Sequence, residues 1–114
     1  MGMFVTARKE DALIISMSGK WMGTDEERQM IEVVREEVKN GATKLIILDL
    51  KKVEWANSYG IGALAGAMTS AHNSTAKLVL ASVPPEIKKL LDLSFLSKVL
   101  PSYPNVDKAL KALE

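Results

Sequence analysis

The 114 residues of this chain fit one domain, residues 1–114, which is long enough to bury a single hydrophobic core. Fifteen Lys and Arg residues against fourteen Asp and Glu residues give a net charge of +1, which argues against nucleic acid or an anionic membrane as the main partner. The chain has no cysteine, which excludes disulfides, thiolate chemistry and Cys-ligated zinc. Residues 1–9 lack the apolar run that is typical of a signal peptide, and no stretch approaches the roughly 20 apolar residues of a membrane helix. We therefore expect a cytoplasmic protein with no membrane insertion.

The first half of the chain predicts a β-hairpin, a helix and a buried strand. Residues 4–8 and 12–18 are runs of strand-forming residues joined by a tight polar turn, and a glycine ends the second run. Thr24-Asp25-Glu26-Glu27 is a capping box, which predicts a helix whose apolar residues recur at helical spacing up to an Asn-Gly pair. Residues 45–50 are almost continuously apolar, which is typical of a parallel strand buried on both faces.

The second half predicts three helices and one more strand. Residues 51–57 form a loop or a short strand extension, and the Gly- and Ala-rich residues 58–70 predict a helix that lies close against the sheet. Residues 77–81 predict a buried strand, Pro84-Pro85 begins a helix that runs through Leu91, and residues 106–113 predict an amphipathic helix. Strands that alternate with helices imply right-handed crossovers. We therefore expect a compact α/β domain, with a mixed sheet of four or five strands and helices packed mainly on one face.

Catalysis by a serine nucleophile is disfavoured by the position of the histidine. Residues 56–60 lie between a strand and a helix and differ by one residue from a Gly-x-Ser-x-Gly nucleophile elbow. The single histidine, His72, lies near the other end of the predicted helix, so a rise of about 1.5 Å per residue places it roughly 20 Å from Ser58. A triad needs these side chains within about 3 Å of each other. We expect no enzymatic activity and interpret His72 as a solvated residue at the helix end.

Metal and phosphate sites are equally unsupported by the sequence. The pairs Glu26-Glu27 and Glu36-Glu37 are adjacent in a predicted helix, so their carboxylates diverge and cannot share one ion. Gly60-Ile61-Gly62 lacks the remaining residues of a dinucleotide or phosphate-binding loop. We therefore expect no metal and no cofactor.

Ser58 is the most informative polar residue of the chain. One interpretation is a helix N-cap, in which its hydroxyl accepts a backbone N–H two or three residues further on. The same position suits a phosphorylation switch, because a phosphate would add up to about two negative charges beside the positive end of the helix dipole. Two tryptophans near loops at the same end of the sheet belong either to the core or to an interface. The candidate partner-binding surface comprises Trp21, Met22, Trp55, Asn57, Ser58, Tyr59 and Gly60.

At these residues the chain resembles the STAS domains, a family that includes bacterial anti-sigma factor antagonists and domains of sulfate transporters. Residues 57–62, Asn-Ser-Tyr-Gly-Ile-Gly, fall on the Asp-Ser-Ser-Gly-Leu-Gly signature of that family. The resemblance extends over nearly the whole chain and also includes Ile14 to Gly19, Lys44 to Val53, Lys77 to Leu80, Ile87 to Leu93 and Asp107 to Leu110.

The resemblance implies a partner-switching protein. In such a protein the unphosphorylated antagonist binds an anti-sigma factor with serine-kinase activity and frees a sigma factor. Phosphorylation of the signature serine, here Ser58, breaks the complex, and a cognate phosphatase restores it. The chain departs from the signature at Asn57 and Tyr59, where the family has Asp and Ser. The alternative is a non-phosphorylated STAS module in another regulatory or transport-accessory complex, and the sequence leaves the pathway and the oligomeric state open.

Overall fold

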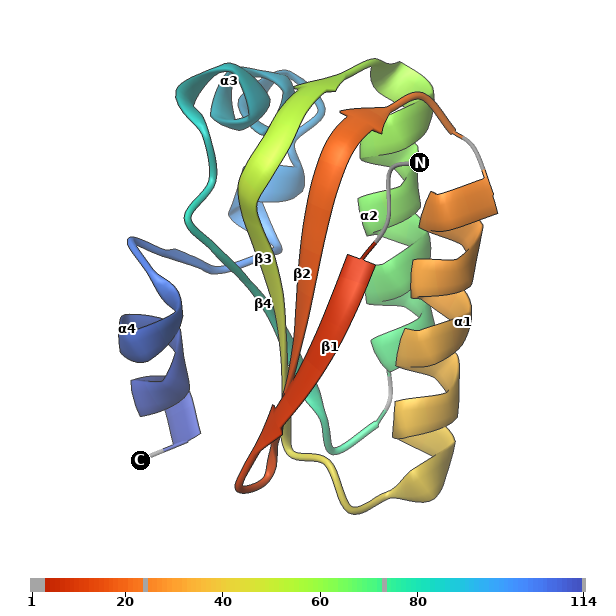
Figure 1. Cartoon of the computed structure of the whole chain (residues 1–114), viewed down its shortest axis with the longest axis vertical. Coiled ribbons are helices and arrows are strands. Elements are labelled where there is room, and N and C mark those ends of the chain that lie inside the picture. Colours follow the sequence, from red (N-terminus) through yellow and green to blue (C-terminus); the bar gives the residue numbers. More distant parts are fainter. Residues whose placement is uncertain (1–3, 24, 73, 114) are drawn as a thin grey trace.

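A computed structural model describes residues 4–23, 25–72 and 74–113, and its strands form a single sheet. The sheet order is β1-β2-β3-β4-β5, antiparallel between β1 and β2 and parallel elsewhere. Figure 1 shows α1 and α2 side by side on one face of the sheet and α4 on the other. The elements in chain order are β1 (Phe4–Lys9), β2 (Ala12–Trp21), α1 (Asp25–Asn40), β3 (Leu45–Ala56), α2 (Ser58–Ala71), β4 (Lys77–Ala81), α3 (Pro85–Leu93), β5 (Ser102–Tyr103) and α4 (Val106–Leu110), with short 3-10 turns at Leu96–Lys98 and Lys111–Leu113.

The central strand β3 divides the core into two layers. Ile46, Leu48 and Leu50 face α1 and α2, while Leu45 and Ile47 face α4, and all five side chains are fully buried. This alternation confirms the prediction of a strand buried on both faces, because successive side chains of a strand point to opposite sides of the sheet. α3 joins the larger layer through two buried apolar side chains. The mixed five-stranded sheet with helices mainly on one face is confirmed.

Two strands extend beyond the apolar runs that predict them. β2 continues through Gly19 to Trp21, and β3 continues to Ala56, which is the strand extension of the two alternatives expected for residues 51–57. Gly19 has a φ of 82° and lies at an irregularity in the pairing of β2 with β3. The glycine therefore allows a bulge within the strand and does not end it, since the pairing resumes beyond it. This extension carries both strands to the start of α2. The expectation that Gly19 ends the strand is wrong.

The remaining differences concern element ends. α2 ends at Ala71, α3 extends to Leu93, and the last helix is α-helical only to Leu110 before a 3-10 turn. The capping box expected before α1 includes Thr24, which lies outside the described residues. α1 ends at the predicted Asn-Gly pair, where Gly41 has a φ of 76°. That left-handed conformation is one that glycine adopts without strain.

A polar cluster joins the hairpin to the end of α1. Arg8 of β1 donates to Glu37 of α1 at 2.7 Å and to the hydroxyl of Thr43 at 3.1 Å, and Thr43 also donates to Glu37. Burial raises the pKa of Glu37, but the hydrogen bonds from Arg8 and Thr43 and the charge of Arg8 outweigh it, so the pKa lies below its ordinary value. The cluster fixes the outer strand of the sheet against the helical layer.

Candidate partner-binding site

The start of α2 is capped by Asn57. Its side-chain oxygen accepts from the backbone N–H of Gly60 at 2.9 Å, and its backbone is extended, as an N-cap residue requires. Ser58 is therefore the first residue of the helix, and the N-cap interpretation of Ser58 is wrong. The Ser58 side chain is exposed and makes no hydrogen bond to any of the described residues. Its hydroxyl is consequently available to solvent.

The end of β2 holds this capped turn in place. The backbone N–H of Asn57 donates to the carbonyl oxygen of Trp21 at 3.0 Å. A Cβ atom at Gly60 would lie 2.3 Å from the same oxygen, so the first turn of α2 can pass this close only with glycine at that position. Gly60 is buried and contributes to the site by letting the backbones approach, not by touching a partner.

The two tryptophans have different roles. Trp21 is 1% exposed and belongs to the main core, so its side chain cannot form the partner-binding surface that the sequence suggested. Its ring is buried because β2 continues past Gly19 and directs the side chain under the first turn of α2. Trp55 precedes the last residue of β3 and remains 44% exposed. Only Trp55 is available to a partner.

Large exposed side chains flank the capped turn that carries Ser58. Met22 follows β2, Trp55 is the second-last residue of β3, and Tyr59 lies in the first turn of α2 with 77% of its surface exposed. Tyr59 lies over Gly23, whose φ is 81° and where an added Cβ atom would approach the Tyr59 Cβ to 2.7 Å. Four of the predicted contact residues are thus exposed near this turn, Met22, Trp55, Ser58 and Tyr59, while Asn57 is half-buried.

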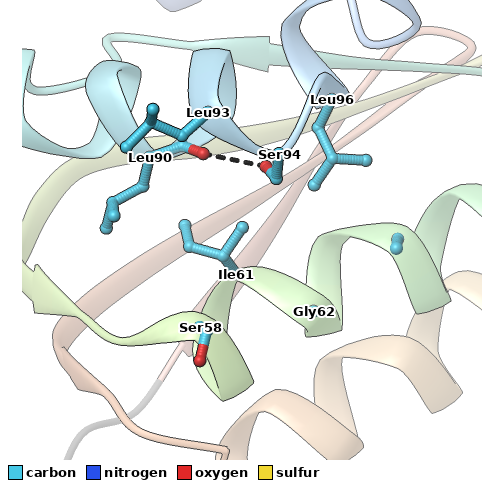
Figure 2. A pocket seen from close by; sticks show the side chains of 8 residues that line it. Ser58, Ile61, Gly62, Leu90, Leu93, Ser94 and Leu96 are labelled. Atoms are coloured by element: carbon cyan, nitrogen blue, oxygen red, sulfur yellow. Dashed lines mark hydrogen bonds between the residues drawn. The ribbon is translucent and has the colours of Figure 1, made fainter.

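A groove of about 360 Å³ begins at Ser58 and was not predicted from the sequence. Figure 2 shows it between the first turns of α2 and the segment that contains α3 and its C-terminal end. We call it the α2–α3 groove. Its lining residues are Ser58, Ile61, Gly62 and Ala65 on α2 and Leu90, Leu93, Ser94 and Leu96 on the opposite side. The apolar spacing in residues 90–96 is visible in the sequence, but the facing of α3 toward α2 depends on how the helices pack.

The arrangement around Ser58 offers no catalytic base or metal ligand set. Ser58 and His72 stand at opposite ends of α2, and His72 is exposed at the C-cap, as predicted for a helix-end residue. Among the described residues, no group of three or more His, Cys, Asp and Glu side chains could hold a metal ion. No helix in the same part of the chain is long and apolar enough to cross a membrane. What the site offers is an exposed hydroxyl among apolar side chains.

A sequence model of the STAS domain matches residues 3–109. The chain belongs to the STAS domain family. The family resemblance and the fold expected from it are therefore confirmed. The matched region includes the whole of the capped turn at Asn57 and Ser58, so the exposed serine lies within the STAS domain itself.

Regulatory proteins are among the relatives of this STAS domain. An anti-sigma F factor antagonist of Paenibacillus polymyxa is 33% identical over 69 residues, which span 60% of this chain and 59% of that protein. The alignment thus covers less than two thirds of the relative. The anti-sigma factor antagonist SpoIIAA in its unphosphorylated form is similar in structure over 96% of both chains, with a TM-score of 0.75 and 15% identity. The phosphorylated Bacillus cell fate determinant SpoIIAA matches with a TM-score of 0.74 and 17% identity, over 97% of this chain and 99% of that one. At these identities the structural likeness concerns the fold, and the regulatory names of the relatives agree with the prediction of a non-enzymatic protein.

Proposed function

We propose that this STAS protein is an anti-sigma factor antagonist whose binding is controlled by phosphorylation of Ser58. The observation that carries the proposal is the exposed Ser58 hydroxyl. This hydroxyl does not cap α2, because the side chain of Asn57 accepts the backbone N–H of Gly60. The partner is an anti-sigma factor with serine-kinase activity, and a phosphatase reverses the modification. The proposal places the protein in the cytoplasm, where these partners act. The curated relative named as an anti-sigma F factor antagonist supports this function class.

A phosphate on Ser58 is compatible with the fold. It would stand at the first residue of the 14-residue helix α2, where unpaired backbone N–H groups and the helix dipole favour negative charge. A partner docked on the exposed Met22, Trp55 and Tyr59 side chains would meet the phosphate as an uncompensated charge, and desolvating such a charge is costly. Phosphorylation should therefore weaken binding without unfolding the protein.

The two departures from the family signature are compatible with this role. Asn57 keeps the side-chain oxygen that caps α2, which is the structural task that an aspartate would share. Tyr59 is 77% exposed, so its bulk adds contact surface and does not disturb the core. Both substitutions change the surface that a partner meets while they leave Ser58 accessible.

The proposal is tested with the anti-sigma factor of the organism that encodes this chain. The purified proteins are mixed with ATP, and the modified residue is mapped by mass spectrometry. We expect phosphate on Ser58 and tighter binding of the anti-sigma factor by unmodified wild type and Ser58→Ala than by Ser58→Asp. Thr75→Asp is the matched control, because Thr75 is exposed in the loop beyond the opposite end of α2. Equal affinity of wild type and Ser58→Asp would leave a binding module without the switch.

A further inference from the structure

The two edges of the sheet differ in length and exposure. β5 forms one edge and is only two residues long, Ser102 and Tyr103. β1 forms the other edge with six residues, all of which except Phe4 are exposed. Figure 1 shows β1 as the outermost strand, and no strand of the described residues pairs with its free side. A long free edge presents unpaired backbone N–H and C=O groups to which another strand can bind.

β1 lacks the features that usually protect an edge strand. Proteins block free edges with proline, with bulges or with charged side chains. β1 contains no proline, and its pairing with β2 runs from Phe4 to Lys9 without a bulge. Of its two cations, Arg8 is bound by Glu37 of its own chain at 2.7 Å, and Lys9 is the last residue of the strand. The edge from Phe4 to Ala7 is therefore uncharged and open to pairing.

The hairpin turn determines which residues of β1 offer backbone groups to the free edge. Residues of an antiparallel pair alternate between hydrogen-bonded and non-hydrogen-bonded positions. Lys9 and Ala12 flank the two-residue turn and lie opposite each other, which is the hydrogen-bonded position in a hairpin of this length. By the same alternation, Phe4, Thr6 and Arg8 direct their N–H and C=O groups away from β2. These three residues are the ones that a new strand would meet.

A second copy of β1 is complementary to this edge in one antiparallel register. A two-fold axis at Thr6 pairs Thr6 with Thr6 of the second copy, and it pairs Phe4 with Arg8 of the second copy. All three outward-directed residues then find partners, and no like charges lie opposite each other. Val5, which is 69% exposed in the single chain, lies opposite Ala7 of the second copy, so that an apolar pair forms on the open face. An axis at Val5 or Ala7 would pair only two of the three outward-directed residues within the strand.

We propose that this protein forms a homodimer in which the β1 strands of two copies pair antiparallel about Thr6 and join the two five-stranded sheets into one. The backbone hydrogen bonds of the three outward-directed residues supply the contact, as in other cases of strand addition. β5 cannot serve in the same way, because a two-residue strand offers too few backbone groups. The inference is independent of the proposed function, since no residue of β1 belongs to the candidate site around Ser58.

Disulfide cross-linking tests the register, because the chain has no cysteine of its own. Thr6→Cys places two cysteines at facing positions whose Cα atoms lie about 5.5 Å apart, which a disulfide can span. We expect this variant to become a covalent dimer under mild oxidation. Lys9→Cys is the matched control, an exposed residue of the same strand. In the proposed register the two copies of residue 9 are offset by six residues, or about 20 Å, and should not cross-link. Equal cross-linking of the two variants overturns the proposal.

Sedimentation equilibrium tests the backbone contact without a cross-link. Thr6→Pro removes the N–H that the second copy would accept, and proline is tolerated in an edge strand where that N–H faces solvent. We expect the dimer dissociation constant to rise by about tenfold or more, whereas Thr6→Val keeps the N–H and should dimerise like wild type. Circular dichroism verifies that each variant folds, and if Thr6→Pro does not, the cysteine pair decides.

The outcomes are independent of the anti-sigma factor. A monomeric wild type at about 1 mM overturns the homodimer and leaves the proposed function intact. A dimer that Thr6→Pro does not weaken, with the variant folded, places the contact elsewhere and also overturns the pairing of β1. A dimer that Thr6→Pro dissociates and that Thr6→Cys cross-links supports it, whatever Ser58→Asp does to partner binding.

Discussion

The backbone of Gly60 lies so close to Trp21 that a Cβ atom at residue 60 would stand 2.3 Å from the Trp21 carbonyl oxygen and 2.6 Å from its carbonyl carbon. This contact fixes the first turn of α2 on the end of β2 and thereby sets the position of Ser58. Trp21 and Gly60 thus position the proposed partner-binding site from beneath.

Gly60→Ala should destabilise the protein by about 1–3 kcal/mol, since the added methyl group meets backbone atoms that cannot rotate away. Gly62→Ala is the control on the same helix, where the added methyl group meets open space and should stabilise by about 0.5–1 kcal/mol. Urea denaturation measures both changes in the free energy of unfolding. A Gly60→Ala variant as stable as wild type would contradict the close contact.

Asn57→Ala should cost about 1 kcal/mol of stability, because the N–H of Gly60 loses its acceptor. Asn57→Asp should keep the stability or raise it slightly, since a carboxylate also accepts this bond and favours the helix N-terminus. Ser58→Ala should change the free energy of unfolding by less than about 0.5 kcal/mol, as expected for an exposed residue that caps nothing. If Ser58→Ala costs as much as Asn57→Ala in thermal denaturation, Ser58 shares the capping role.

The two tryptophans should respond oppositely to removal. Trp21→Ala should destabilise by about 3–5 kcal/mol, because a side chain that is 1% exposed leaves a cavity in the main core. Trp55→Ala should change stability by less than about 1 kcal/mol, since Trp55 is 44% exposed, and should instead weaken binding of the anti-sigma factor. Chemical denaturation and calorimetric titration of both variants provide the measurements. Equal losses of stability in the two variants would contradict the difference in burial between the Trp21 and Trp55 rings.

Acid should weaken the contact between β1 and α1. Because the folded pKa of Glu37 is lowered, its carboxylate stabilises the native state above the unfolded pKa of about 4.3, and this contribution is lost as the pH falls through the lower folded value. Glu37→Gln should therefore be less stable than wild type near neutral pH, with the difference shrinking below about pH 4. Free energies of unfolding at several pH values test this, with Glu36→Gln as the control on the same helix because Glu36 is exposed. A difference independent of pH would exclude Glu37 ionisation as the cause.

The order of elements and the position of Ser58 follow from local signals that the sequence carries by itself. The apolar run at residues 45–50 is buried on both faces, and the Gly- and Ala-rich residues after Ser58 form α2. Periodicity and helix-end residues act over a few neighbouring positions, so they are readable without knowledge of distant contacts. The local pattern places Ser58 at a helix start, but Asn57 is the residue that caps the helix. Asn57 and Ser58 are both good N-cap residues, and only the backbone conformation distinguishes them.

Burial and shape around the site were decided by tertiary structure. Trp21 is core and Trp55 is surface because β2 continues beyond Gly19 and stays paired with β3 as far as Trp21 and Ala56. This pairing depends on contacts between residues far apart in the chain. The two-residue β5 forms only by pairing with β4, since so short a segment has no periodicity of its own. The α2–α3 groove likewise exists because two helices pack with small residues between them. Sequence alone determined the helices and the longer strands, whereas packing determined β5 and which side chains a partner can reach.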